Sequence, residues 1–220
     1  MHHYLPAAPL LATFVAASLA LAITPGPGVI YIVTRSLSQG RSAGFASVGG
    51  IAAGNIVNAV AASLGLAAVL ATSALLYAVL KYLGAAYLFY LAFQMLRRRA
   101  ETAEATVSMQ RTRPGKVFRD GMIVAILNPK TALFYAALLP QFVDSPRDFT
   151  AQALALSAVF VSIAALSDSM YVLLSRGLAA RFGARARGLT AGRYAAAALY
   201  AGLGVLAATT NQPGAHKAIR

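Results

Sequence analysis

The chain contains no cysteine, six acidic residues and three histidines. Without cysteine it can form no disulfide, no thiolate metal site and no cysteine nucleophile. The histidines all lie in the tails, at His2, His3 and His216. No His-x-x-x-His pair, phosphate loop or nucleophile elbow occurs. A membrane enzyme that hydrolyses or transfers groups needs paired acids, a histidine cluster or an activated nucleophile. The sequence therefore predicts no enzyme, no cofactor and no resident metal.

Charge is also scarce, at 11% of residues against 59% apolar ones, and the mean hydropathy is +0.66. Such a chain is too apolar for an ordinary soluble domain, and its apolar residues form blocks separated by basic loops. We expect one all-α membrane domain over residues 1–220 that contacts lipid. The net charge of +13 lies in those short loops and not on one basic face, so no nucleic-acid partner is predicted.

Apolar windows predict six transmembrane helices, each long enough to cross about 30 Å of hydrocarbon. They cover residues 8–34, 43–66, 74–96, 121–142, 151–174 and 191–210. Most Lys and Arg residues follow the first, third and fifth spans. Because positive loops stay in the cytoplasm, both termini are predicted to be non-cytoplasmic.

A polar connection divides the chain into two similar halves. We predict a cytoplasmic linker at 97–120 between a repeat at about 8–96 and a repeat at about 121–210. Three spans in each half would insert from opposite sides, which defines two inverted three-helix repeats. The first span of one half contains TPGP at 24–27, and the first span of the other contains NPKT at 128–131. Proline interruptions at corresponding positions indicate a transport site.

The sequence PGPG at 25–28 should unwind the first span, because proline removes a backbone donor and glycine lowers chain stiffness. Freed carbonyls and amides are tolerated in a bilayer only where protein or a watery cavity satisfies them. A half-helix beginning after Pro27 would aim its N–H groups at that cavity, which suits a carboxylate. A kink that only shapes packing is the alternative. Four breakers, answered by NPK at 128–130, favour the cavity.

Two charges are predicted inside the spans, Lys130 and Asp168. A cation near mid-membrane costs about 2.5 to 3.5 kcal/mol unless it is paired or hydrated. In one interpretation the two residues form a buried ion pair that fixes packing. In the other, Asp168 exchanges a proton or binds a substrate ammonium, while Lys130 or the half-helix amides hold a carboxylate.

For the other polar residues inside the spans, the sequence gives weaker indications of a role in substrate binding. Glycines before Asn55 let helices approach closely, so Asn55 either packs or binds substrate, whereas Asn58 is expected to hydrogen-bond across a helix contact. Tyr31, Tyr135 and Tyr171 are expected mainly in packing or at the interface.

Several motifs together resemble the lysine-exporter (LysE/RhtB) family of bacterial amino-acid efflux proteins, over about residues 10–208. They are TPGPG, GIAAGN, KYLGAAYLFYLA, NPK and SDSMY. The resemblance implies an inner-membrane exporter of amino acids or derivatives such as lysine, homoserine, threonine or homoserine lactone. It also implies proton coupling and homodimerisation. Carried over by position, it implies roles for the PGP element at 25–27, for NPK at 128–130 and for Asp168.

The leading hypothesis is a secondary transporter that exports amino acids by alternating access, in antiport with protons that bind Asp168. The alternative is a metal-ion exporter or passive channel of the same fold, although a cation pathway should carry several carboxylates or soft ligands. The predicted substrate site comprises Pro25, Gly26, Pro27, Gly28, Asn55, Asn128, Pro129, Lys130 and Asp168.

Overall fold

The computed structural model describes residues 4–72, 74–97, 112–145 and 148–182, with isolated residues between 194 and 209. Within these residues all regular secondary structure is helical, which confirms the all-α prediction. The elements are α1 (Ala8–Ile23), α2 (Pro27–Gln39), α3 (Arg41–Thr72), α4 (Ala74–Arg97), α5 (Pro114–Ile126), α6 (Pro129–Leu138), the 3-10 helix η1 (Leu139–Phe142) and α7 (Phe149–Phe182).

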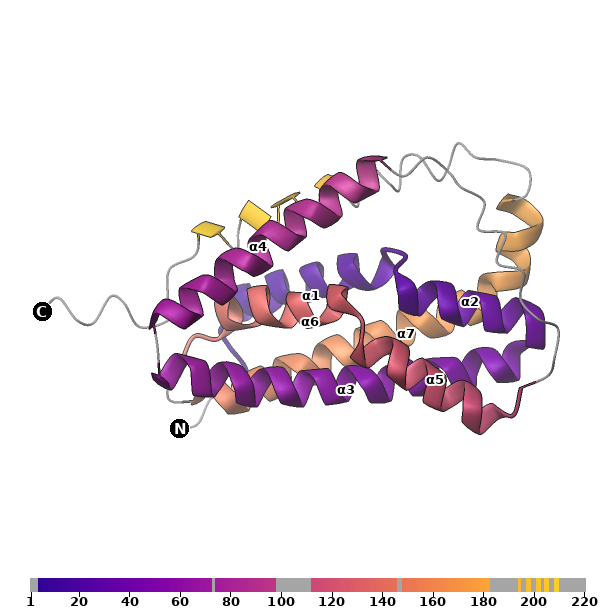
Figure 1. Cartoon of the computed structure of the whole chain (residues 1–220), viewed down its shortest axis with the longest axis horizontal. Helices are drawn as coiled ribbons and strands as arrows, with labels where there is room; N and C mark the ends of the chain where they lie inside the picture. The colour runs from indigo at the N-terminus through magenta and orange to yellow at the C-terminus, as the bar shows by residue number, and fades with distance from the viewer. Residues whose placement is uncertain are drawn as a thin grey trace, which may run out of the picture.

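The helices run along the long axis of the molecule (Figure 1). In Figure 1, helix α2 continues in the direction of α1 and α6 in that of α5, whereas the chain reverses direction before α3, α4, α5 and α7. By length and composition, Arg41–Ala68 and Phe149–Ser175 can each cross a membrane, and the bent pair α1 and α2 forms a third candidate among the described residues. The span predicted at 191–210 lies mostly outside the described residues. Six spans in two inverted repeats, with both termini non-cytoplasmic, therefore stay a prediction.

The predicted interruptions are confirmed in both halves. The span predicted at 8–34 is two helices, α1 and α2, which meet at an angle of 48°. The span predicted at 121–142 divides into α5 and α6 at Asn128. In Figure 1 both breaks lie near the middle of the long axis. Helix α5 begins at Pro114, before the predicted start near 121, because the fixed φ of proline suits the first helical position.

Helices α3 and α5 approach each other through glycine. A Cβ atom added at Gly50 would lie 2.1 Å from the carbonyl oxygen of Phe118, and one at Gly54 would lie 2.5 Å from that of Met122. Only residues without a side chain allow two backbones to come this close. Asn58 then donates from Nδ2 to the Ala125 carbonyl at 2.9 Å, as expected for a residue that bonds across a helix contact.

Two buried apolar clusters hold the helices together. The larger cluster includes six aromatic residues from α1, α6, η1 and α7, namely Phe14, Phe134, Tyr135, Phe142, Phe149 and Phe160. The smaller cluster joins α2, α3, α5 and α7 through Ile32, Val48, Ile51, Ala125 and Val172. Large apolar side chains also lie exposed on the outer surface, such as Ile56, Leu64, Leu166 and Met170. Such exposed apolar side chains around a packed interior suit a lipid environment.

Candidate functional site

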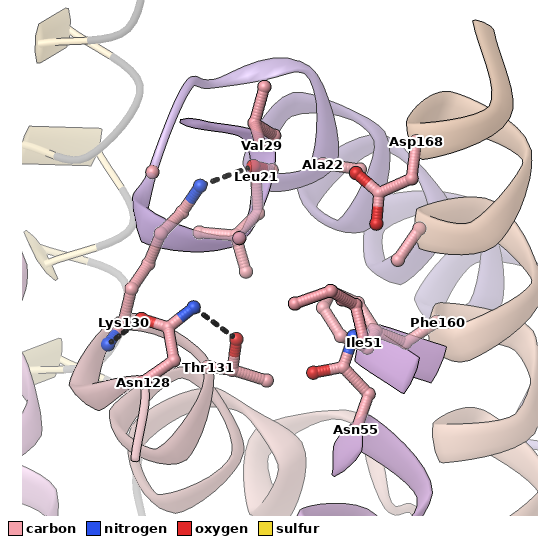
Figure 2. A pocket seen from close by; sticks show the side chains of 13 residues that line it. Leu21, Ala22, Val29, Ile51, Asn55, Asn128, Lys130, Thr131, Phe160 and Asp168 are labelled. Atoms are coloured by element: carbon pink, nitrogen blue, oxygen red, sulfur yellow. Dashed lines mark hydrogen bonds between the residues drawn. The ribbon is translucent and has the colours of Figure 1, made fainter. Parts of the chain in front are cut away.

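A small cavity with both polar and apolar walls lies beside the two breaks, with a volume of about 50 Å³. Figure 2 shows side chains from α1, α3, α6 and α7 converging on it. The volume has room for a few water molecules. The cavity is lined by Leu21, Ala22, Gly26, Gly28, Val29, Ile51, Asn55, Asn128, Lys130, Thr131, Phe160, Ala164 and Asp168.

The prolines that break the helices leave carbonyl groups without their usual donors. Proline has no N–H, so the carbonyl four residues earlier loses its helical hydrogen bond. Helix α1 ends at Ile23, so its last carbonyls lack helical donors; two of them, those of Leu21 and Ile23, lie four residues before Pro25 and Pro27. Lys130 Nζ donates to the Leu21 oxygen at 2.8 Å, and the Tyr171 hydroxyl donates to the Ile23 oxygen at 2.6 Å.

The second break repeats this arrangement. Pro129 frees the carbonyl of Ala125, which is the oxygen that accepts the hydrogen bond from Asn58. The backbone N–H of Asn128 also donates to it, at 3.1 Å. Each freed carbonyl is thus satisfied by a side chain from another helix. The freed oxygens are bonded to protein, whereas the sequence left open whether protein or water would satisfy them.

The side chain of Lys130, from α6, places its ammonium at the carboxyl end of α1. Its ammonium donates to the Leu21 oxygen and also to the Thr24 oxygen, at 2.6 Å. Carbonyl groups at a helix carboxyl end carry partial negative charge and stabilise a cation. A Cβ atom added at Gly26 would lie 3.2 Å from Lys130 Cδ, so glycine at this position leaves room for the lysine side chain.

Asp168 faces the cavity from α7, across from Lys130 (Figure 2). Asp168 is buried, with 7% of its surface exposed. Among the described residues none forms a hydrogen bond or an ion pair with it. The buried ion pair considered from the sequence is therefore not formed, because the Lys130 ammonium reaches the carbonyl groups of α1 instead. The carboxylate of Asp168 remains available to a ligand or a proton.

The amino ends of the two half-helices differ. Gly26 precedes α2, and no described side chain caps this end. The first-turn amides of Gly28 and Val29 therefore have no helical acceptor, and both residues line the cavity. At α6, by contrast, Asn128 Oδ1 accepts from the Lys130 backbone N–H at 3.1 Å. The open amino end of α2 is the one suited to an anion.

Asn55 projects into the cavity from α3 (Figure 2). Its side chain is 5% exposed, and its Oδ1 atom has no hydrogen-bond partner in the described structure. An unpartnered buried acceptor is costly unless a water or ligand satisfies it. This geometry favours binding over the packing role that the sequence also allowed.

The structure divides the predicted site residues into two groups. Gly26, Gly28, Asn55, Asn128, Lys130 and Asp168 line the cavity. Pro25, Pro27 and Pro129 do not line it and instead form the breaks. Tyr171, expected from the sequence mainly in packing or at the interface, donates a hydrogen bond to the Ile23 carbonyl at the first break. Its signal was the position three residues after Asp168, which places both side chains on one face of α7.

Broken helices that meet at a cavity lined by charged and amide side chains inside an apolar bundle are typical of a class of membrane transporters. The chain belongs to the LysE type translocator family, whose model matches residues 19–211. The family resemblance noted in the sequence is thereby confirmed, and the chain is a multi-pass membrane protein.

Three relatives illustrate the family. An uncharacterized membrane protein of Pseudomonas aeruginosa is 32% identical over 202 residues, covering 90% of this chain and 94% of the relative. A homoserine/homoserine lactone efflux protein of Salmonella typhimurium is 31% identical over 73% of this chain and 77% of the relative. A leucine efflux protein of Salmonella choleraesuis is 26% identical over 74% and 77%. No solved structure matches the chain.

Proposed function

We propose that this protein exports amino acids or their derivatives across the bacterial inner membrane in exchange for protons. The observation that carries the proposal is the cavity itself. It has uncapped helix amides on one wall and the unpartnered carboxylate of Asp168 on another. The family and the efflux names of two relatives support the same substrate class.

A zwitterion fits these groups in one orientation. Its carboxylate would accept from the amides of Gly28 and Val29, at the positive end of the α2 dipole. Its ammonium would donate to Asp168 and to the unpartnered Oδ1 of Asn55. The apolar side chains of Ile51 and Phe160 would surround the substrate side chain.

Asp168 also supplies a mechanism for proton coupling. A carboxylate paired with a substrate ammonium cannot hold a proton at the same time. Release of the amino acid on the outer side would free Asp168 to bind a proton, and release of that proton in the cytoplasm would prepare it for the next substrate. Each state favours a different occupant, so proton entry drives substrate exit.

The cavity must enlarge during this cycle, because about 50 Å³ holds little more than water. The breaks between α1 and α2 and between α5 and α6 are the sites where half-helices can change angle without disrupting a continuous helix. We propose that these angles change as the cavity opens alternately to the two sides of the membrane.

The membrane topology and assembly belong to the same proposal. The chain reverses direction before α3, α4, α5 and α7 (Figure 1), as successive spans require, and the placement of both termini outside the cytoplasm rests on the distribution of Lys and Arg. Reporter fusions or protease access at the 97–120 linker test this orientation, and an external linker would overturn it. The homodimer implied by the resemblance is tested by measuring the mass of the purified protein in detergent or nanodiscs.

The proposed transport is tested in proteoliposomes with an imposed pH gradient, using radiolabelled leucine and homoserine as probes. Asp168→Asn should abolish proton-driven accumulation. Asp148→Asn makes the same chemical change outside the cavity and should retain transport. Full proton-dependent transport by Asp168→Asn would overturn the coupling role. Parallel assays with manganese and cobalt test the metal-export alternative. If the solute never accumulates beyond equal concentrations on the two sides of the membrane, the protein is a channel.

A further inference from the structure

We infer that Lys130, Tyr171 and Asn58 are positioning residues that hold the two helix breaks in place. Their side chains replace the backbone donors that Pro25, Pro27 and Pro129 lack. Lys130 in particular acts on the carboxyl end of α1 and is not the ligand of the substrate carboxylate. Its transport consequences rest on the proposed function, whereas the hydrogen bonds themselves can be tested without transport.

The match between prolines and donors is complete at these breaks. The carbonyl four residues before each proline accepts a side-chain hydrogen bond, at 2.8 Å, 2.6 Å and 2.9 Å. The donors come from α6, α7 and α3, so neither break is held by its own helix. Lys130 of the second half binds a carbonyl of the first half, and Asn58 of the first half binds a carbonyl of the second. The two breaks therefore support each other.

The three carbonyl oxygens differ in whether they have a second hydrogen-bond donor. The Leu21 oxygen also accepts from the Thr24 backbone N–H at 3.3 Å, and the Ala125 oxygen accepts from Asn128. Among the described residues, only Tyr171 donates to the Ile23 oxygen. Ile23 is 59% exposed on the apolar surface, where lipid offers no replacement donor. Of the three donors, the Tyr171 hydroxyl is therefore the one whose loss should lower the stability of the protein most.

The geometry of Lys130 also limits what its ammonium can bind. An ammonium has three N–H groups, and two of them donate to Leu21 and Thr24. A substrate carboxylate could therefore receive only the one remaining N–H unless these bonds break, which would leave both carbonyls without their side-chain donor. The uncapped amides of α2 can donate to the same carboxylate without that loss.

The first experiment compares two tyrosines by thermal unfolding of the purified protein in detergent. Tyr171→Phe removes the donor to Ile23 and should lower Tm by about 4–8 °C. Tyr31→Phe is the matched control, since its hydroxyl also donates to a backbone carbonyl, that of Val117, at 2.8 Å. Val117 lies within α5 with no proline four residues later, so its oxygen keeps a helical donor. Equal shifts in Tm would overturn the inference.

The second experiment separates positioning from substrate binding by Lys130. Leucine and its carboxamide, leucinamide, are compared in the transport assay, leucinamide as a competitor. If Lys130 only positions α1, Lys130→Met should lower Vmax about tenfold or more while changing the leucine-to-leucinamide preference less than about twofold. Lys130→Gln keeps an NH₂ donor without charge and should recover part of the rate.

Failure of the positioning role and failure of the proposed function give different results. Loss of the preference for leucine over leucinamide in Lys130→Met would show that Lys130 binds the carboxylate, and would overturn its positioning role. If the wild-type protein transports neither leucine nor homoserine, the proposed function fails. The comparison of Tyr171→Phe with Tyr31→Phe still tests the carbonyl bonds in that case.

Discussion

Replacing Gly50 by alanine would put a methyl group against the backbone of α5. The added Cβ would lie 2.1 Å from the Phe118 carbonyl oxygen and 2.9 Å from its carbonyl carbon. Ordinary contact begins near 3.4 Å, so α3 and α5 must separate by roughly 1.3 Å at this point. No flexible side chain can move to relieve the overlap. The same two helices carry Asn55 and the break at Asn128, so the cavity would be displaced as well.

The expected loss can be estimated. Overpacking of this kind costs about 3 kcal/mol, of which alanine recovers about 1 kcal/mol through its higher helix propensity. A net loss of about 2 kcal/mol should lower Tm by about 4–8 °C for a chain of this length. Leucine transport should fall with it, because Asn55 no longer faces Asp168 at the same separation.

Thermal unfolding in detergent measures this effect, with Gly65→Ala as the matched control. Gly65 lies in the same helix, and a Cβ atom there would have no neighbour within 4 Å. That substitution should raise Tm by up to about 4 °C, through helix propensity alone. If Gly50→Ala raises Tm as Gly65→Ala does, the close contact between α3 and α5 does not exist.

Three other variants test the site and the core. Asn55→Leu removes an unpartnered acceptor, so Tm should stay equal or rise while the KM for leucine increases about tenfold; an unchanged KM would argue against a ligand role. Asn128→Ala should lower Tm by about 2–4 °C through loss of the α6 cap, and Asn128→Ser should restore it by keeping an acceptor; equal Tm values would contradict the cap. Phe134→Ala should lower Tm by about 10 °C or more, since the ring is fully buried and lies 4.8 Å from Phe160, whereas the exposed Phe45→Ala should change it little.

Local sequence patterns were sufficient to predict the interruptions and the all-helical character of the described residues. Proline acts on the carbonyl four residues earlier whatever the surroundings, so the breaks at 24–26 and near Asn128 follow from the chain alone. The scarcity of acids inside the spans likewise directed attention to Asp168. Family motifs supported the same positions. These features depend on covalent geometry and composition more than on helix packing.

The partners of the polar groups could not be predicted in the same way. The pairing of Lys130 with carbonyls of α1 depends on where α6 lies relative to α1, which no local pattern specifies. The same holds for Tyr171 and Asn58, whose acceptors are distant in the sequence. The cap that Asn128 forms on α6 was a local signal, the preference of asparagine for that position, which the sequence reading did not use.

The absence of native cysteine allows a direct test of a hydrated cavity at the helix breaks. Single cysteines are introduced by Asn55→Cys, facing the cavity, and by Ile56→Cys, whose native side chain is 52% exposed on the apolar surface. Only a hydrated thiol ionises and reacts readily with a small water-soluble methanethiosulfonate reagent. Reaction after denaturation confirms that both thiols are present.

In vesicles of both orientations, the account predicts that the cysteine at position 55 reacts and is protected by leucine, while the cysteine at position 56 stays unreactive. If the thiol at position 55 is as inert as its neighbour from both sides, the cavity is sealed from water and the proposed transport route is wrong.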